Sequence, residues 1–107
     1  MRRVNEAVRE VLAAAIATEM KDPRIGFVTV TDVDTSPDLR AARVYVSVLG
    51  SAEERESALE GLRSAHGFLQ ARIAAEMRMK RTPTLTFEYD ESIERGARLT
   101  RLLEEDE

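Results

Sequence analysis

The chain has 107 residues, of which 43% are hydrophobic and 34% are charged, and its formal net charge is −4. This length and composition are typical of a single soluble globular domain and not of a disordered chain. The absence of cysteine excludes disulfides, thiol nucleophiles and thiolate metal sites. No apolar run approaches the ~20 residues of a membrane span and no signal-peptide pattern opens the chain, so we expect a cytoplasmic protein without a membrane partner.

The first element that we predict is a helix over residues 3–20, where apolar side chains recur every three or four positions. Pro23 ends this pattern because proline disfavours the helical conformation of the residue before it. Residues 27–35 and 40–49 are rich in β-branched side chains and predict two strands. The short turn signal between them favours an antiparallel hairpin. The inner face of the second strand is expected to carry Ala42, Val44, Val46 and Val48.

The second half of the chain predicts two consecutive helices, a strand and a last helix. Ser51 and Glu54 form a capping box that begins a helix running to about residue 64. A second helix is expected over residues 67–79, a third strand over 84–90 with Leu85, Phe87 and Tyr89 inside, and a last helix over 92–103. An acidic tail follows. Gly67 lies within the helical pattern, where glycine costs about 1 kcal/mol relative to alanine. We therefore expect a bend at Ala65-His66-Gly67, with small side chains that permit a close approach.

The resulting order is α-β-β-α-α-β-α, with a helical crossover of over thirty residues between the second and third strands, which predicts that they pair in parallel. This is an α+β, two-layer sandwich on a three-stranded mixed sheet, in one domain over residues 1–107. The arrangement is that of a type II KH domain. KH domains usually hold single-stranded nucleic acid with a Gly-x-x-Gly loop, which is missing here.

Four segments closely resemble the ribosome-binding factor A family: residues 3–6 (RVNE), 21–31 (KDPRIGFVTVT), 36–48 (SPDLRAARVYVSV) and 89–96 (YDESIERG). In that family an Ala-x-Gly helix kink replaces the Gly-x-x-Gly loop, and Ala65 and Gly67 match it. The resemblance implies a non-enzymatic factor, with no cofactor and no small-molecule substrate. Such a factor binds the free small (30S) ribosomal subunit and its rRNA, but not translating ribosomes. It also implies roles in late maturation, in processing the 5′ end of 16S rRNA and in growth in the cold.

The charge distribution provides the candidate binding residues. Residues 61–83 contain five basic side chains and one acidic one, Glu76, whereas 51–60 and 84–107 are acidic. Such segregation predicts a polarised surface that attracts phosphates in one region despite the negative total. The candidate RNA- or ribosome-binding residues of this segment are Arg63, His66, Arg72, Arg78, Lys80 and Arg81. The alternative is that they form only a solvated helix face.

A second, weaker basic group comprises Arg40, Arg43 and the loop that holds Lys21 and Arg24. The strand face with Arg43 and Tyr45 is open to RNA, with Tyr45 stacking on a base, unless the last helix covers it. His66 is the only histidine and has no partner acid or nucleophile in the sequence, which argues against catalysis. The sequence contains no phosphate-binding glycine loop, catalytic triad or metal-ligand motif.

Two other functions remain compatible with this sequence. A general single-stranded RNA-binding protein would have the same fold, although only 5% of the residues are aromatic and base stacking requires such platforms. A protein-interaction adaptor would use the acidic segments 51–60 and 88–107 as contact surfaces. Nothing in the sequence requires more than a monomer.

Overall fold

The structure, a computed structural model, describes residues 2–20, 22–79 and 81–92. Its elements in chain order are α1 (Arg2–Thr18), β1 (Val28–Thr35), β2 (Ala41–Val48), α2 (Ala52–Ser64), α3 (His66–Met77) and β3 (Thr84–Tyr89). These six elements have the predicted type and order, and their ends lie within two residues of the predicted ones. The predicted last helix over 92–103, the glycine at 96 and the acidic tail lie outside the described residues, apart from Ser92.

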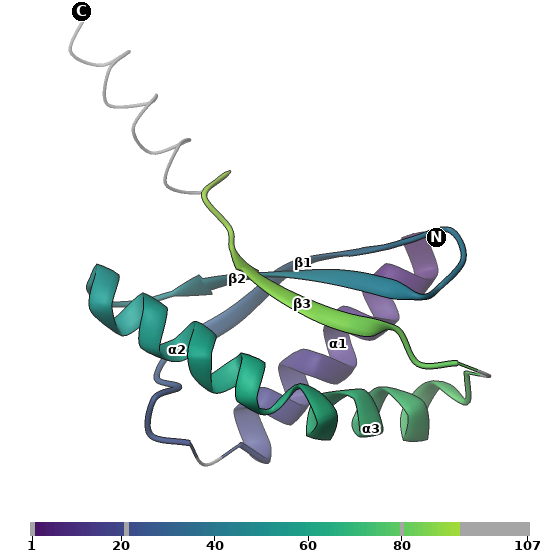
Figure 1. The fold of residues 1–107 in the computed structure, drawn as a ribbon, viewed down its shortest axis with the longest axis horizontal. Helices are drawn as coiled ribbons and strands as arrows, with labels where there is room; N and C mark the ends of the chain where they lie inside the picture. Colours follow the sequence, from purple (N-terminus) through teal and green to yellow (C-terminus); the bar gives the residue numbers. More distant parts are fainter. Residues whose placement is uncertain (1, 21, 80, 93–107) are drawn as a thin grey trace, which may run out of the picture.

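The three strands form one mixed sheet in the order β1-β2-β3 (Figure 1). β1 and β2 pair antiparallel, and β2 and β3 pair in parallel, as the long helical crossover predicted. The hairpin turn between β1 and β2 is closed by the Ser36 amide, which donates a 2.8 Å hydrogen bond to the carbonyl oxygen of Ala41. Leu39 takes a positive φ of 61° within this turn. The fold is therefore α+β.

A β-bulge interrupts the regular alternation of β1. The register shifts between Val30 and Asp32, so Val30 and Val33 are both buried although they are three residues apart. Side chains therefore do not alternate simply along residues 27–35, because the extra residue at the bulge moves every later side chain to the other face. That extra residue, Thr31, donates a 2.6 Å hydrogen bond from its hydroxyl to Oδ2 of Asp90, just after β3.

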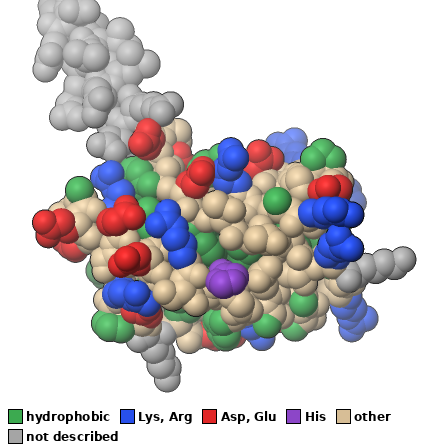
Figure 2. Space-filling view, in the orientation of Figure 1, with side chains coloured by type: hydrophobic (Ala, Val, Ile, Leu, Met, Phe, Trp, Pro, Cys, Tyr) green, Lys and Arg blue, Asp and Glu red, His purple; other side chains and the backbone are tan. Residues whose placement is uncertain are grey.

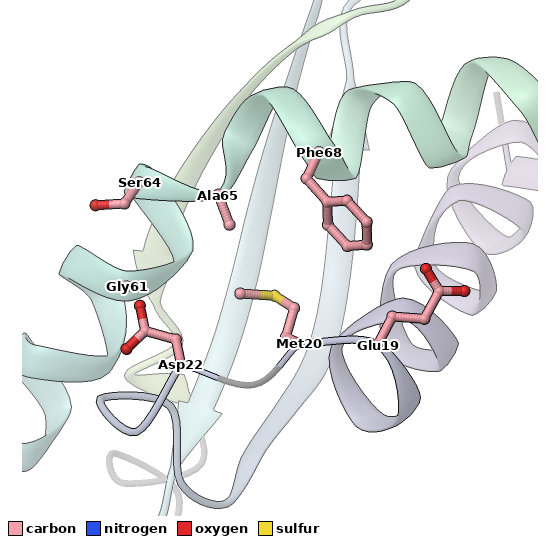
Figure 3. A pocket seen from close by; sticks show the side chains of 7 residues that line it. All are labelled: Glu19, Met20, Asp22, Gly61, Ser64, Ala65 and Phe68. Atoms are coloured by element: carbon pink, nitrogen blue, oxygen red, sulfur yellow. The ribbon is translucent and has the colours of Figure 1, made fainter.

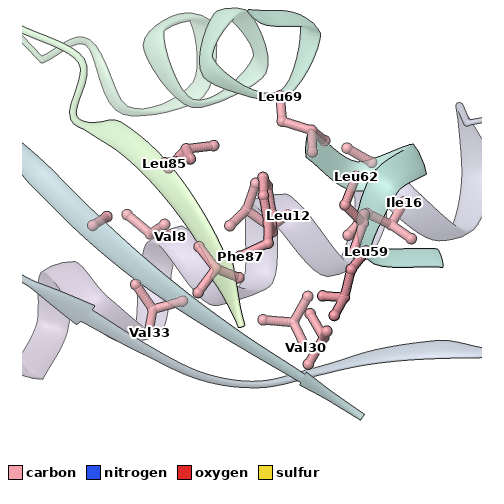
Figure 4. Close-up of a cluster of buried hydrophobic side chains, with 14 of the residues drawn as sticks. Val8, Leu12, Ile16, Val30, Val33, Leu59, Leu62, Leu69, Leu85 and Phe87 are labelled. Carbon is pink, nitrogen blue, oxygen red and sulfur yellow. The ribbon is translucent and has the colours of Figure 1, made fainter. Parts of the chain in front are cut away.

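The helices pack on one face of the sheet, in two layers, and the core lies between these layers (Figures 1 and 4). β2 alternates as predicted, with the four inner side chains buried. Leu85 and Phe87 of β3 are buried with them, whereas Tyr89 is half-buried and has the Arg55 guanidinium 3.8 Å from its ring centre. The helices contribute Val8, Leu12, Ile16, Leu59, Leu62, Leu69 and Ile73. Truncating a core aromatic such as Phe87 to alanine would cost about 3–5 kcal/mol.

α2 and α3 meet at a single residue, Ala65, whose φ of −94° and ψ of 10° interrupt the helix. The predicted capping box at the start of α2 is present, with both Ser51–Glu54 hydrogen bonds. The expected close approach at Gly67 is wrong: a Cβ on Gly67 would meet nothing within 4 Å. The close approach is at Gly61, where a Cβ would lie 2.9 Å from Ile25 Cγ1. Residue type alone does not reveal which of two helical glycines faces a neighbouring segment.

Candidate nucleic-acid interface

Arg78 ends α3 and directs the chain toward the sheet. It adopts the left-handed conformation, with φ 51° and ψ 40°, and its amide donates a 3.1 Å hydrogen bond to the carbonyl oxygen of Ala74. Glycine is usual at such a helix end, because a side chain there costs on the order of 1 kcal/mol. The Arg78 side chain is exposed at this corner.

Arg40 and Arg81, which belong to separate basic groups in the sequence, line one hollow. The hollow has a volume of about 460 Å³, and its other lining residues are Asp38, Leu39 and Met79. The β1–β2 turn and the segment before β3 meet here, because the Thr84 amide donates a 2.9 Å hydrogen bond to the carbonyl oxygen of Arg40. Lys and Arg side chains gather at this end of the molecule (right in Figure 2). The tertiary structure therefore brings Arg40, from the weaker basic group, beside Arg81 at the end of the main basic segment.

Ion pairing divides the predicted arginines into two sets. Within residues 2–20, 22–79 and 81–92, no carboxylate lies within 4.0 Å of the Arg78 or Arg81 guanidinium group. Arg40 is only loosely paired, with Nε 3.8 Å from Oδ2 of Asp38. Exposed and weakly paired guanidinium groups are available for bidentate contacts with phosphate.

Arg72 and Arg63, in contrast, already contact carboxylates. The Arg72 Nη2 atom lies 3.1 Å from Oε1 of Glu19 and 3.3 Å from Oε1 of Glu76. Arg63 lies 3.4 Å from Oε1 of Glu56 and also donates to the carbonyl oxygen of Phe87 at 3.3 Å. The expectation that Glu76 alone opposes this basic face is wrong, because helix packing brings in Glu19, just after α1, and Glu56, from earlier in α2.

His66, the first residue of α3, is exposed, and its Nδ1 atom lies 2.9 Å from the carbonyl oxygen of Arg63. It therefore contacts a carbonyl at the end of α2, where the backbone acceptors lack helical partners. The partner of this ring nitrogen is thus a backbone carbonyl and not a nucleophile or an acid. This geometry is that of a helix-end contact.

The residues of the second basic group do not form one basic surface. Arg24 is held by Asp22, to whose carboxylate it donates from Nε and Nη2, and these bonds lower the pKa of Asp22 below its ordinary value. Arg43 extends from the open sheet face, with Nη1 3.4 Å from the Tyr45 hydroxyl and Nε 3.6 Å from Glu88. Lys21, like Lys80, lies outside the described residues. Asp34 lies opposite Arg43 in the β1–β2 register, so this arginine has a carboxylate on each neighbouring strand, Asp34 on β1 and Glu88 on β3.

The α2–α3 junction itself borders an apolar groove and not a basic surface. A hollow of about 260 Å³ lies between the end of α1 and this junction (Figure 3). The side chains of Met20 and Phe68 lie over it, and Glu19 and Asp22 contribute carboxylates. No arginine is among the described residues that line it. The candidate basic surface is therefore at the far end of α3 and not at the junction.

A sequence model of ribosome-binding factor A matches residues 1–103. The chain belongs to the ribosome-binding factor A family. The crystal structure of ribosome-binding factor A from Thermus thermophilus is 31% identical, with a TM-score of 0.77 over 85% of this chain and 96% of that one. A solution NMR structure of a putative ribosome-binding factor A from Thermotoga maritima is 34% identical, with a TM-score of 0.76 over 85% of this chain and 87% of that one.

A third similar structure is of a ribosome-binding factor A in its complex. It is a homology model of the Thermus thermophilus factor fitted into a cryo-electron-microscopy map of a 30S–RbfA complex. It is 32% identical and has a TM-score of 0.68, over 81% of this chain and 91% of that one. Ribosome-binding factor A is a binding factor and not an enzyme, so family membership confirms the expectation of a non-enzymatic protein.

Metal sites and membrane spans are both absent from the described part of this ribosome-binding factor A family member. In residues 2–20, 22–79 and 81–92, no group of three or more histidine or carboxylate side chains is placed to hold a metal ion. Over the same ranges, no helix has the length and apolar character needed to cross a membrane.

Proposed function

We propose that this chain binds the free small ribosomal subunit by contacting the rRNA backbone with the basic end of the molecule. The observation that carries the proposal is that the exposed, weakly paired Arg40 and Arg81 line one hollow. The exposed Arg78 directly precedes Met79, which lines the same hollow. Lys80 lies between two of these arginines in the sequence and adds a further positive charge. Family membership and the 30S complex of the Thermus thermophilus relative support the small subunit as the partner.

Within this proposal the other candidate residues have smaller roles. Arg63, Arg72, Arg24 and Arg43 each contact a carboxylate, so a phosphate would have to displace an existing partner. His66 and the β2 face contribute to the perimeter of the contact. The proposal therefore assigns most of the electrostatic attraction to the end of α3 and the β1–β2 turn.

The proposed fold is a type II KH-like domain over residues 1–107, in which the Ala65-x-Gly67 junction replaces the Gly-x-x-Gly loop. The interruption at Ala65 sets the direction of α3, and the segment that follows α3 places Met79 beside the β1–β2 turn residues of the hollow. The junction is thus an architectural feature and does not itself read RNA. Because Gly67 has open space around it, the bend does not depend on a missing side chain at that position.

The cellular role that we propose is late maturation of the 30S subunit in the cytoplasm, including processing of the 5′ end of 16S rRNA and support of growth in the cold. The protein would act as a monomer that joins an immature subunit and leaves before translation. This part of the proposal rests on family membership. Its test is the level of 16S precursor with an unprocessed 5′ end in cells that lack the protein, grown warm and cold.

Co-sedimentation tests the binding function directly. The purified protein is incubated with isolated 30S subunits, 50S subunits, assembled ribosomes and a short single-stranded RNA. Selective binding to free 30S subunits is expected. Equal binding to every RNA would instead indicate a general RNA-binding protein, and 30S binding that persists after reversal of Arg78 and Arg81 would overturn the proposed surface.

A further inference from the structure

Phe27 and Leu49 form an exposed apolar pair where β1 begins and β2 ends. Their exposed fractions are 78% and 74%, and the Leu49 amide donates a 3.1 Å hydrogen bond to the Phe27 carbonyl oxygen. Single exposed apolar residues are common, but two large ones side by side indicate a contact surface. The pair lies at the opposite end of the β1–β2 ladder from the basic hollow, roughly 30 Å along β2 from Arg40 at ~3.3 Å per strand residue.

The turn after Leu49 presents this pair rigidly. Gly50 has a φ of +141°, and a Cβ there would lie 2.7 Å from Oε2 of Glu54. The Glu54 amide donates to Oγ of Ser51 at 3.1 Å, and the Ser51 amide donates to Oε1 of Glu54 at 3.3 Å. The apolar pair is therefore attached to the capped start of α2 and not to a loose loop. A preordered surface loses less conformational entropy when a partner binds.

The surroundings of the pair are acidic. Residues 51–60 contain four carboxylates and one arginine, and two of these carboxylates, Glu53 and Glu54, lie in the first turn of α2 directly after the pair. Asp and Glu side chains lie over α2 with basic side chains between them (left in Figure 2). Glu53, four residues after Leu49, is exposed and has no ion pair with another described residue. Such a surface repels phosphates and attracts cations. It complements a positively charged polypeptide and not an RNA backbone.

We propose that Phe27, Leu49 and Glu53 dock a basic protein segment that carries a large apolar side chain. This inference rests on the proposed function, because the segment would belong to a protein of the small ribosomal subunit. The molecule then has two contact surfaces of opposite charge: arginines that bind RNA at one end of the hairpin, and an acidic, apolar surface that binds protein at the other. A particle made of RNA and basic proteins offers both kinds of partner.

Photo-cross-linking on purified 30S subunits tests this arrangement. Benzoylphenylalanine is placed at position 49 in one protein and at position 81 in another. The expected product at position 49 contains a ribosomal protein and survives ribonuclease, whereas the product at position 81 contains rRNA. Cross-linking of position 49 to rRNA, to a second copy of the chain or to nothing, while the protein still co-sediments with 30S subunits, would overturn the inference. Loss of co-sedimentation itself would overturn the proposed function, and the inference with it.

Charge reversal provides a second, independent test. Glu53→Lys is expected to weaken 30S binding by about fivefold, as the loss of a well-placed interface contact typically does. Glu10→Lys changes the net charge equally on an exposed position of α1 and should leave the affinity unchanged. If RNA lay against this surface, the added lysine would strengthen binding instead. Either stronger binding by Glu53→Lys or an equal loss in both variants contradicts the inference.

Truncation of Phe27, one member of the apolar pair, is a third test of the inference. Phe27→Ser is expected to lower 30S affinity at least about fivefold, whereas Phe68→Ser, at a site that is 42% exposed beside the α2–α3 junction, serves as the matched control. Phe27 lies outside the core, so its variant should keep the circular dichroism spectrum and the melting temperature of the parent. Unchanged affinity of a folded Phe27→Ser protein would contradict the inference.

Discussion

Gly61 of α2 lies directly against Ile25 of the segment between α1 and β1. A Cβ on Gly61 would be 2.9 Å from Ile25 Cγ1 and 3.3 Å from Oδ2 of Asp22. A contact shorter than 3.0 Å forces a neighbour to move. This glycine therefore lets α2 pack closely against the connection that leads into the sheet.

Gly61→Ala is expected to destabilise the protein by about 1–3 kcal/mol, the usual cost of overpacking a buried site. Gly67→Ala is the matched control: its new methyl group enters open space within α3 and should stabilise the protein by up to about 1 kcal/mol. Urea unfolding of both variants measures the difference. Equal effects of the two substitutions would contradict the close packing at Gly61.

The double variant Arg78→Glu/Arg81→Glu is expected to lower 30S affinity at least about tenfold, because it removes two weakly paired cations and adds repulsion. The dependence of log affinity on log salt should become shallower by roughly 1.4 if both residues contact single-stranded phosphates. Titrations at several salt concentrations measure both quantities. An unchanged salt slope would show that neither arginine contacts a phosphate.

Arg72 has a different expected role, because it joins the end of α1 to α3 through Glu19 at 3.1 Å. Both side chains are about one-third exposed, so the pair is partly screened and should contribute about 0.5–1 kcal/mol. A double-mutant cycle with Arg72→Ala and Glu19→Ala, followed by urea unfolding, measures this coupling. Zero coupling energy, together with a loss of 30S binding in Arg72→Ala, would instead show that Arg72 belongs to the binding surface.

The Thr31–Asp90 hydrogen bond predicts a pH-dependent contribution to stability. Hydrogen bonds from the Ser92 hydroxyl and then from the Thr31 hydroxyl hold the pKa of Asp90 below its ordinary value. An aspartate whose pKa is lowered by folding stabilises the protein above its unfolded pKa of about 3.9, and this stabilisation is lost as the pH falls through the folded pKa.

Thr31→Val is therefore expected to cost about 1 kcal/mol near pH 6 and less at a pH below the folded pKa of Asp90, where its carboxyl group is protonated. Urea unfolding of the parent and the variant at both pH values measures this difference. Ser92→Ala should behave in the same way, because it removes the other hydroxyl donor to Asp90. An equal cost of Thr31→Val at both pH values would show that the carboxylate charge is not involved.

Local patterns in the sequence were sufficient to predict the type and order of the six described elements. Alternation along β2, the Ser51–Glu54 capping box and the break at Pro23 all depend on neighbours within a few residues. The parallel pairing of β2 and β3 also followed from the length of the connection. The family was recognised from sequence motifs as well, and the family model that matches residues 1–103 confirms it.

Other features of the fold and of the candidate site depend on contacts between residues far apart in the sequence, which local patterns do not contain. The bulge at Thr31, the carboxylate of Glu19 beside Arg72 and the meeting of Arg40 with Arg81 each join residues from distant parts of the chain. Charge counts along the sequence identified the basic segment, but they do not show which arginines already have a carboxylate partner. That availability depends on how helices pack on a sheet, and only the tertiary structure determines it.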